Sequence, residues 1–384
     1  MSMPARTLAN ILKPEHNNFG AIRLAMALAV LVSHSYWLAT GQPSEEPLHS
    51  WTHHSLGEHA VQVFFFLSGV VVTQSILKSG SLIDFATARC LRIFPALIVC
   101  VLLTALALGP LMSTGAVSAY FTDSMLPTYI VKTILLTTGS APLTGVFTDN
   151  PVPNLVNLSL WTLKYEVLCY GLLALFGLAY VHFPRLRSAL TFAVACVVAG
   201  IFVGAPKPIS GYTTADNLRY FVLFFSTGTL AYLMRDRLVL TWLALPVLFG
   251  IFVLAIGSRF GELTSALFLG YGTLLVASLS WPKIRHFTNR NDYSYGVYII
   301  ACPVQQALLS AFPGLSPIAL TALAIGIVVP LAALSWRFIE RPAMQRRHGL
   351  AARIKAHWLR LDQLRQGFAL KTRRSAPGML SGKD

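Results

Sequence analysis

Residues 19–41 read FGAIRLAMALAVLVSHSYWLATG. A helix of roughly 20 apolar residues crosses a hydrocarbon layer about 30 Å thick, so this run is long enough to span a membrane. The run also contains Arg23 and His34. Titratable side chains are costly inside a membrane, so by default they face the interior of a helix bundle and carry a function. The stretch predicts both a membrane-spanning fold and a place for chemistry.

Apolar runs of this kind recur along the chain, which is 55% hydrophobic and only 12% charged, against roughly 25% charged residues in a soluble domain. Backbone polar groups in lipid are satisfied only in helices or closed barrels, and the runs lack the alternating pattern of a barrel strand. We therefore predict an all-α, polytopic membrane bundle of about ten transmembrane helices, at residues 19–41, 59–77, 93–112, 160–181, 189–205, 220–234, 238–257, 263–280, 294–312 and 316–336.

The net charge of +15 is distributed unevenly between the connecting segments. Basic residues on the cytoplasmic side fix the orientation of a membrane protein. Both termini are predicted to be cytoplasmic, because the inner segments then hold Arg6, Lys13, Lys78, Arg89, Arg92, Arg185, Arg187, Arg235, Arg237, Lys283, Arg285, Arg290 and the basic tail. The predicted parts are a cytoplasmic N-terminal segment (1–18), a transmembrane domain (19–343) and a basic cytoplasmic tail (344–384).

Two segments fall outside this regular pattern. Residues 113–159 are rich in proline and predict an outer loop or a re-entrant segment beside a cavity. Apolar residues at near-helical spacing in the tail predict an amphipathic helix on anionic lipid, in preference to a nucleic-acid-binding segment. The five cysteines form no CxxC pair, so neither a disulfide framework nor a metal site is expected.

Arg23 and His34 lie eleven residues apart, which places them within about 20° of each other on one helix face and about 16 Å apart along the axis. Arg23 is either a functional cation or an anchor that reaches the inner surface. His34 is either a catalytic base or a hydrogen-bonding group between helices. Glu166, in the fourth apolar run, is expected at a similar depth and would orient the His34 ring and raise its basicity.

Two further motifs precede or interrupt apolar runs. FFFLSG (64–69) places Ser68 and Gly69 in mid-membrane, a pair that more often indicates close helix packing than nucleophilic attack. RCLRIFP (89–95) places Arg89 and Arg92 three residues apart and hence on one helix face. Two guanidinium groups there either bind phosphate or only set the topology.

Six blocks in order resemble the acyltransferase 3 family: Arg23 with His34, FFFLSG, RCLRIFP, SLWTLKYE (159–166), SYGVYIIACPV (294–304) and SWRFIERP (335–342). The resemblance covers about residues 17–343. It implies a multi-pass protein of the bacterial inner membrane that transfers acetyl groups from cytoplasmic acetyl-CoA to exported glycans. It also implies that Arg23 and His34 are essential, that Arg89 and Arg92 assist on the donor side, and that Glu166 belongs to the site.

The residues and the resemblance predict one mechanism. Acyl-CoA, as donor substrate, rests its phosphates on Arg89, Arg92 and Arg23, and no metal is needed. His34 acts as general base on a sugar hydroxyl or carries the acyl group itself. Expected partners are acyl-CoA, an extracytoplasmic glycan acceptor, membrane lipids and, in a homo-oligomer, further copies of the chain, but no nucleic acid. Expected substrate contacts are Tyr36, Ser68 and Trp161.

The competing hypothesis is a secondary transporter of ten helices. Arg23, His34 and Glu166 would then relay protons or anions. The two halves of the chain show no internal repeat, which disfavours this alternative.

Overall fold

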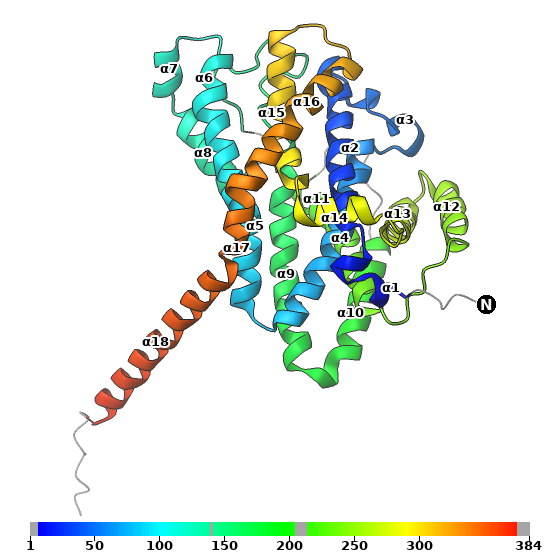
Figure 1. The fold of residues 1–384 in the computed structure, drawn as a ribbon, viewed down its shortest axis with the longest axis vertical. Coiled ribbons are helices and arrows are strands. Elements are labelled where there is room, and N and C mark those ends of the chain that lie inside the picture. Colours follow the sequence, from blue (N-terminus) through cyan, green and yellow to red (C-terminus); the bar gives the residue numbers. More distant parts are fainter. Residues whose placement is uncertain (1–6, 139–140, 204–212, 375–384) are drawn as a thin grey trace, which may run out of the picture.

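A computed structural model of the chain describes residues 7–138, 141–203 and 213–374, and these form helices without a β-sheet (Figure 1). Residues 1–6 of the expected N-terminal segment, 204–205 of the fifth expected span and 375–384 of the expected tail lie outside this description. The all-α class is confirmed for the described part.

Each of the ten predicted spans corresponds to a helix. These helices are α2 (Phe19–Thr40), α4 (Leu56–Ser79), α5 (Leu82–Leu103), α9 (Leu163–His182), α10 (Arg187–Val203), α11 (Thr214–Leu233), α12 (Ala244–Ala255), α13 (Gly261–Ala277), α15 (Ser294–Ala311) and α16 (Pro317–Ser335). The π-helical turns η3 (Thr104–Leu108) and η6 (Trp336–Glu340) extend α5 and α16 into α6 (Gly109–Met112) and α17 (Arg341–Gln345).

Within the described residues, five helical stretches are long and apolar enough to cross a membrane: Phe19–Thr40, Leu56–Ser79, Leu82–Met112, Leu158–His182 and Pro317–Leu361. A sixth crossing is added if α13 and α14 (Pro282–Arg290), which meet at 102°, form one broken span. The other predicted spans are helical but shorter or more polar. For example, α15 buries Gln305 and Gln306.

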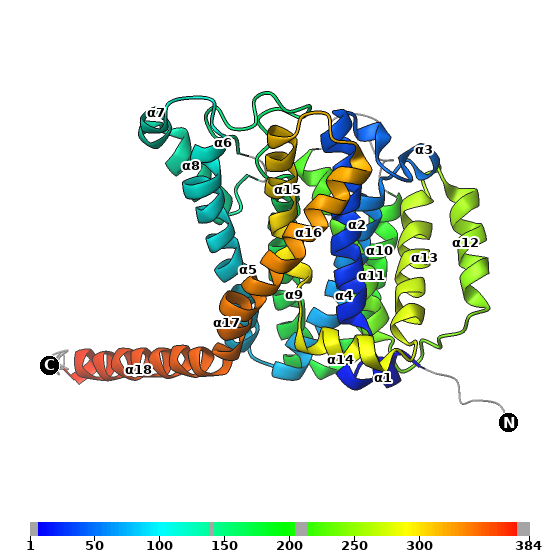
Figure 2. The ribbon, with the colours of Figure 1, turned by 45° about the horizontal axis from the view of Figure 1, so that its top comes forward.

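The two ends of the bundle carry different short elements (Figure 2). One end, the tail face, carries α1 (Leu8–Ile11), η1 (Pro14–His16), η5 (Pro184–Leu186), α14 and α18 (Arg347–Arg374). The opposite end, the loop face, carries η2 (Pro43–Glu45), α3 (His49–Thr52), α7 (Val117–Thr122) and α8 (Met125–Ile134). The segment predicted as an outer loop therefore contains two short helices.

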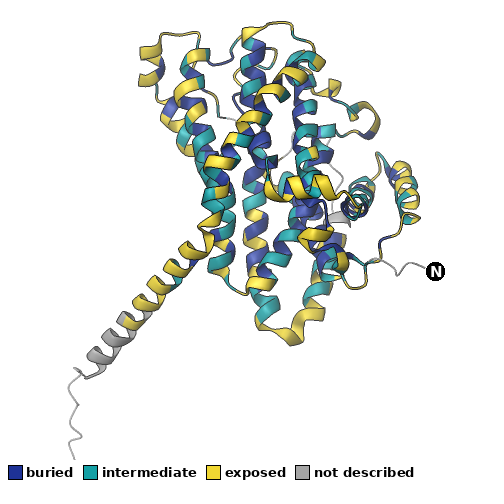
Figure 3. Cartoon of the chain, viewed as in Figure 1, coloured by how far each residue is buried: buried dark blue, intermediate teal, exposed yellow. Residues whose placement is uncertain are grey.

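Helix α18 leaves the bundle at the tail face and runs across its axis (Figure 2). Its first turns pack on α5, where Lys355 pairs with Asp84, but most of its described side chains are exposed (Figure 3). The amphipathic helix expected in the tail is therefore helical, and its association with lipid stays a prediction.

The centre of the bundle depends on a close contact between α4 and α11. A Cβ atom on Gly69 would lie 2.1 Å from the Phe225 carbonyl oxygen, and one on Gly228 would lie 2.0 Å from the Phe66 carbonyl oxygen. The two backbones therefore touch at reciprocal glycines, which is how membrane helices gain van der Waals contact. For Gly69 this confirms the packing interpretation of the FFFLSG motif.

We predict that Gly69→Ala or Gly228→Ala lowers the stability of the bundle by about 1–3 kcal/mol, the usual cost of overpacking a core. Thermal unfolding of the purified protein in detergent measures this. Gly171→Ala and Gly326→Ala are matched controls, because no atom lies within 4 Å of the added methyl group. Equal melting temperatures for all four variants would contradict the proposed contact.

Candidate active site

A cavity opens between α2, α4, α5, α9 and α15. Its charged or hydroxyl-bearing lining residues are Arg23, Ser68, Arg89, Arg92, Thr162, Glu166, Tyr170, Ser294, Tyr295 and Tyr298. Five motifs that are distant in the sequence thus meet at one place. Of the predicted site residues, Arg23, Ser68, Arg89, Arg92 and Glu166 line this cavity, whereas His34, Tyr36 and Trp161 are not among its lining residues.

Arg23 and Arg92 are held by carboxylates that the sequence analysis did not single out. One oxygen of Asp292 lies 3.2 Å from Arg23 and 2.9 Å from Arg92. Arg92 also pairs with Glu340 at 3.4 Å. Asp292 is buried, which alone would raise the pKa of its carboxyl, but Arg23 and Arg92 hold that pKa well below its usual range. The carboxylate is charged at neutral pH and forms a continuous ion-pair chain with both guanidinium groups.

Glu340 is placed by the π-helical turn η6. The extra residue in a π turn changes the direction of the side chains that follow, and such turns are frequent at functional sites. The Glu340 side chain is 2% exposed and accepts a hydrogen bond from Ser335 at 2.9 Å. Gly296 leaves room for it, because a Cβ there would lie 3.0 Å from Ala332 and 3.3 Å from Glu340. The SYG and RFIERP motifs therefore fit together around this carboxylate.

Glu166 contacts Ser68 at 3.3 Å and accepts a hydrogen bond from the Tyr170 hydroxyl. The guanidinium of Arg89 lies over the Tyr170 ring, 5.8 Å from its centre. Arg89 forms no ion pair within the described residues, and its Nε–H is buried without a hydrogen-bond partner. A guanidinium group without a carboxylate at ion-pair distance in the described residues thus lines the cavity.

The expected pairing of Glu166 with His34 is wrong. Ser33, next to His34, accepts a hydrogen bond from the Gly57 amide, whereas Glu166 contacts Ser68, eleven residues further along α4. Eleven helical residues span about 16 Å. The prediction failed because η4 (Leu158–Thr162), which precedes α9, is itself buried, so α9 starts inside the bundle and Glu166 lies deeper than expected.

His34 is 8% exposed, and its Nδ1 atom has no hydrogen-bond partner in the described structure. Its neighbours are both bonded: Ser33 donates to Glu46, and Ser35 accepts from Gln305 at 2.6 Å. The His34 ring is therefore buried between two hydrogen-bonded serines, with its Nδ1 left unpaired among the described residues. Between Arg23 and His34 the same helix face is filled, because Ala27 and Leu31 are fully buried in the apolar core.

The cavity nevertheless reaches almost to the depth of His34. Its lining includes Val61, which is four residues, or about 6 Å, along α4 from Gly57. Two of the three predicted substrate contacts, Trp161 and Tyr36, are not among the lining residues of the cavity. Trp161 packs against Tyr165 and Phe221, and Tyr36 lies two residues beyond His34 in α2, with a half-buried side chain.

The acyltransferase-domain family model matches residues 17–337. The chain belongs to the acyltransferase 3 family. The acyltransferase is 30% identical over 339 residues to an O-acetyl transferase of Shigella phage Sf6, covering 86% of this chain and 96% of that protein. It is also 30% identical over 367 residues to nodulation protein 10 of Rhizobium leguminosarum bv. viciae, covering 88% and 95%. No solved structure matches it.

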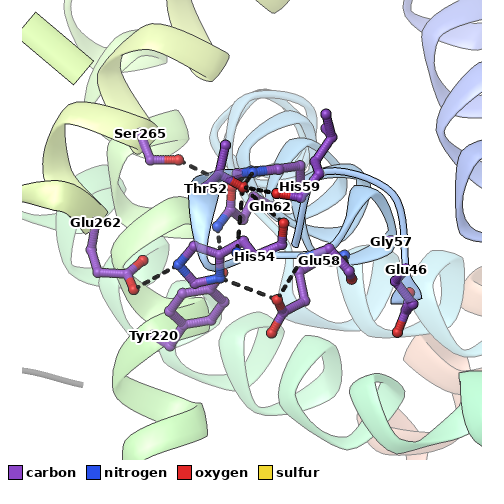
Figure 4. A network of polar contacts seen from close by, with 12 residues as sticks. Glu46, Thr52, His54, Gly57, Glu58, His59, Gln62, Tyr220, Glu262 and Ser265 are labelled. Atoms are coloured by element: carbon purple, nitrogen blue, oxygen red, sulfur yellow. Dashed lines mark hydrogen bonds and ion pairs between the residues drawn. The ribbon is translucent and has the colours of Figure 1, made fainter. Parts of the chain in front are cut away.

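A second polar cluster of the acyltransferase lies at the loop face (Figure 4). His54 bonds Glu58 and Glu262, each at 3.2 Å, and stacks on Tyr220. The neighbouring Gln62 accepts from His59 and Ser265 and donates to Tyr220. The cluster ties α4, α11 and α13 together. Residues 54–60, HSLGEHA, supply His54, Glu58 and His59, but Glu262 lies 208 residues from His54, so the sequence alone does not reveal the cluster.

Protonation of His54 determines the strength of this cluster. Burial alone would lower the pKa of His54, but hydrogen bonds to Glu262 and Glu58 outweigh it and raise the pKa to about 9. Because the pKa of His54 in the folded protein exceeds the usual value of 6.5 for histidine, the stabilisation is complete below pH 6.5 and is lost as the pH rises through about 9.

We predict that the melting temperature of the acyltransferase falls between pH 6.5 and 9.5, and that His54→Gln removes most of this dependence. Differential scanning fluorimetry in detergent across this range measures both. His53→Asn is the control. His53 is exposed and its backbone φ angle is positive, a conformation that asparagine adopts readily. If the melting temperatures of wild type and His54→Gln depend on pH in the same way, the ion pairs of His54 with Glu58 and Glu262 do not stabilise the fold as described.

Proposed function

We propose that the protein is an O-acetyltransferase that moves an acetyl group from cytoplasmic acetyl-CoA to a hydroxyl of an extracytoplasmic glycan. The observation that carries this proposal is the cavity, because it extends from Arg89 to Val61, about 6 Å along α4 from the level of His34, whose ring Nδ1 has no hydrogen-bond partner in the described residues. The similarity to an O-acetyl transferase of a phage supports acetyl as the transferred group. The position of the cavity within the helix bundle supports transfer from one side of the membrane to the other.

In the proposed topology, the protein crosses the bacterial inner membrane with ten helices, and both termini lie in the cytoplasm. The tail face then faces the cytoplasm. This orientation places the basic α14 and α18 against anionic lipid, where each Lys or Arg contributes about 1 kcal/mol of attraction. It also places the acidic loop-face residues Glu45, Glu46, Glu58 and Glu262 outside.

The donor approaches from the tail face. The nucleotide part of coenzyme A is too highly charged to enter lipid, so its phosphates remain near the cationic wall. The thin pantetheine arm extends along the cavity past Ser68 and Thr162 towards Val61. This route brings the thioester close to the depth of His34 without a channel through the filled face of α2.

His34 then accepts the proton of the acceptor hydroxyl as that oxygen attacks the thioester carbonyl carbon. The tetrahedral intermediate collapses, the carbon–sulfur bond breaks, and the coenzyme A thiolate takes the proton from His34. In the covalent route, His34 carries the acetyl group between two such steps. Developing negative charge on the carbonyl oxygen is stabilised by nearby N–H or O–H donors. Of the predicted donors, Tyr36 is the candidate next to His34, because Arg23 and Ser68 lie about 16 Å from this level along their helices.

His34→Ala is expected to lower acetyl transfer by about 100-fold or more, the lower range of general-base contributions. Ester-linked acetate in surface polysaccharides of the producing strain, together with free-thiol release from acetyl-CoA by the purified protein, measures this. His182→Gln is the matched control, because His182 is exposed at the end of α9. Near-normal acetate in the His34→Ala strain, with normal protein levels, would refute the role of His34.

Arg89→Ala is expected to raise the apparent KM for acetyl-CoA about tenfold or more, because a charge-assisted hydrogen bond contributes about 1.5–3 kcal/mol. Its kcat should change less. Steady-state kinetics with the purified protein separates the two parameters, and exposed Arg185→Ala is the control. An unchanged KM for acetyl-CoA would show that Arg89 does not bind the donor and only sets the orientation of the protein in the membrane.

A further inference from the structure

The ion-pair chain beside the cavity contains two guanidinium groups and two carboxyl groups. Arg23 and Arg92 supply the guanidinium groups, and Asp292 and Glu340 supply the carboxyl groups. Asp292 is central because a single carboxylate oxygen contacts both guanidinium groups. Its other oxygen accepts a hydrogen bond from the Ser294 hydroxyl at 2.6 Å. Both oxygens of Asp292 are therefore engaged.

The position of Asp292 is fixed from two sides. It lies between α14, which packs on α2 where Gly20 meets Thr288, and α15, which begins at Ser294. Asp292 is 14% exposed at its side chain. Buried carboxylates held by two guanidinium groups keep those groups in one orientation, because each charge-assisted bond restricts direction as well as distance.

This arrangement changes what Arg23 can bind. One of its two terminal nitrogens, Nη2, lies 3.2 Å from Asp292. Its buried Nε–H has no hydrogen-bond partner in the described structure, and the residue lines the cavity. A guanidinium that is already neutralised attracts a phosphate weakly but still donates a hydrogen bond. Arg89, without an ion pair in the described part of the chain, retains its full charge for an anion.

We propose that Asp292 is a positioning residue that neutralises Arg23 and Arg92 and directs the Arg23 Nε–H towards an uncharged carbonyl oxygen of the acyl-pantetheine arm, which leaves the phosphates to Arg89. This proposal rests on the proposed function. It divides the three cavity arginines into one phosphate ligand and a fixed pair that orients the neutral part of the donor.

Two ligands separate these roles. Acetyl-CoA contains the pantetheine arm, whereas adenosine 3′,5′-bisphosphate contains phosphates without it. With the purified full-length protein, Asp292→Asn is expected to lower kcat for acetyl-CoA about tenfold or more, since small displacements of a positioning group have large effects on rate. The same variant should bind adenosine 3′,5′-bisphosphate within about twofold of wild type or more tightly, because it loses a negative charge near the site.

Arg89→Ala is expected to show the reverse pattern, with weakened binding of adenosine 3′,5′-bisphosphate. Asp292→Glu should recover part of the lost kcat, because the charge is restored. Asp236→Asn is the matched control, since Asp236 is exposed and its one ion pair among the described residues is with its neighbour Arg235. A merely structural role for Asp292 would lower bisphosphate binding and turnover together.

A wild-type kcat in Asp292→Asn, or loss of bisphosphate binding as large as in Arg89→Ala, would overturn the proposal. If Asp292→Asn fails to fold, Ser294→Ala tests the same proposal. This variant removes the hydrogen bond from Ser294 to Asp292 and keeps every charge, so it should lower kcat without weakening the binding of adenosine 3′,5′-bisphosphate. Failure of the wild-type protein to use acetyl-CoA would instead refute the proposed function, so the two failures are distinguishable.

Discussion

Asp292 binds Arg23 of α2 and Arg92 of α5 at the same time, and Arg92 continues the chain to Glu340 after α16. Unpaired charges are expensive in an apolar bundle, and removing one member of a buried pair is strongly destabilising. The relative positions of three helices are thus tied to one another through charge. Arg23 and Arg92 also form part of the cavity lining, so the same ion pairs hold this wall of the cavity in place.

Helix α4 connects that charged region with the loop face. Near its start, Gly57 and Glu58 bond Ser33 and His54, and near its middle, Gly69 meets α11. Ser68, adjacent to this glycine, contacts Glu166 on the other side of the helix. Close packing on one face of α4 therefore supports the polar contacts on the other, which explains why a serine and a glycine stand side by side in FFFLSG.

The sequence predicted the helices well, because long apolar runs in lipid permit few alternatives. It also predicted Arg23, Arg89 and Arg92 together on the donor side, and these three residues line the cavity. It failed where depth depends on tertiary structure, as for Glu166, since the buried turn before α9 leaves no hydropathy signal. Asp292 and Glu340 were missed as partners because residues far apart in the chain determine them, although Glu340 stands within a motif that was recognised.

The buried turn before α9 also constrains how the protein is made. Asn157 bonds the Ile299 carbonyl, the Leu158 amide bonds Cys302, and Thr162 bonds Tyr298. All three partners belong to α15, which the ribosome synthesises more than 130 residues later. The turn cannot satisfy these groups when it first reaches the membrane. Assembly of this wall of the cavity is consequently a late event in biogenesis, completed only after α15 has been inserted.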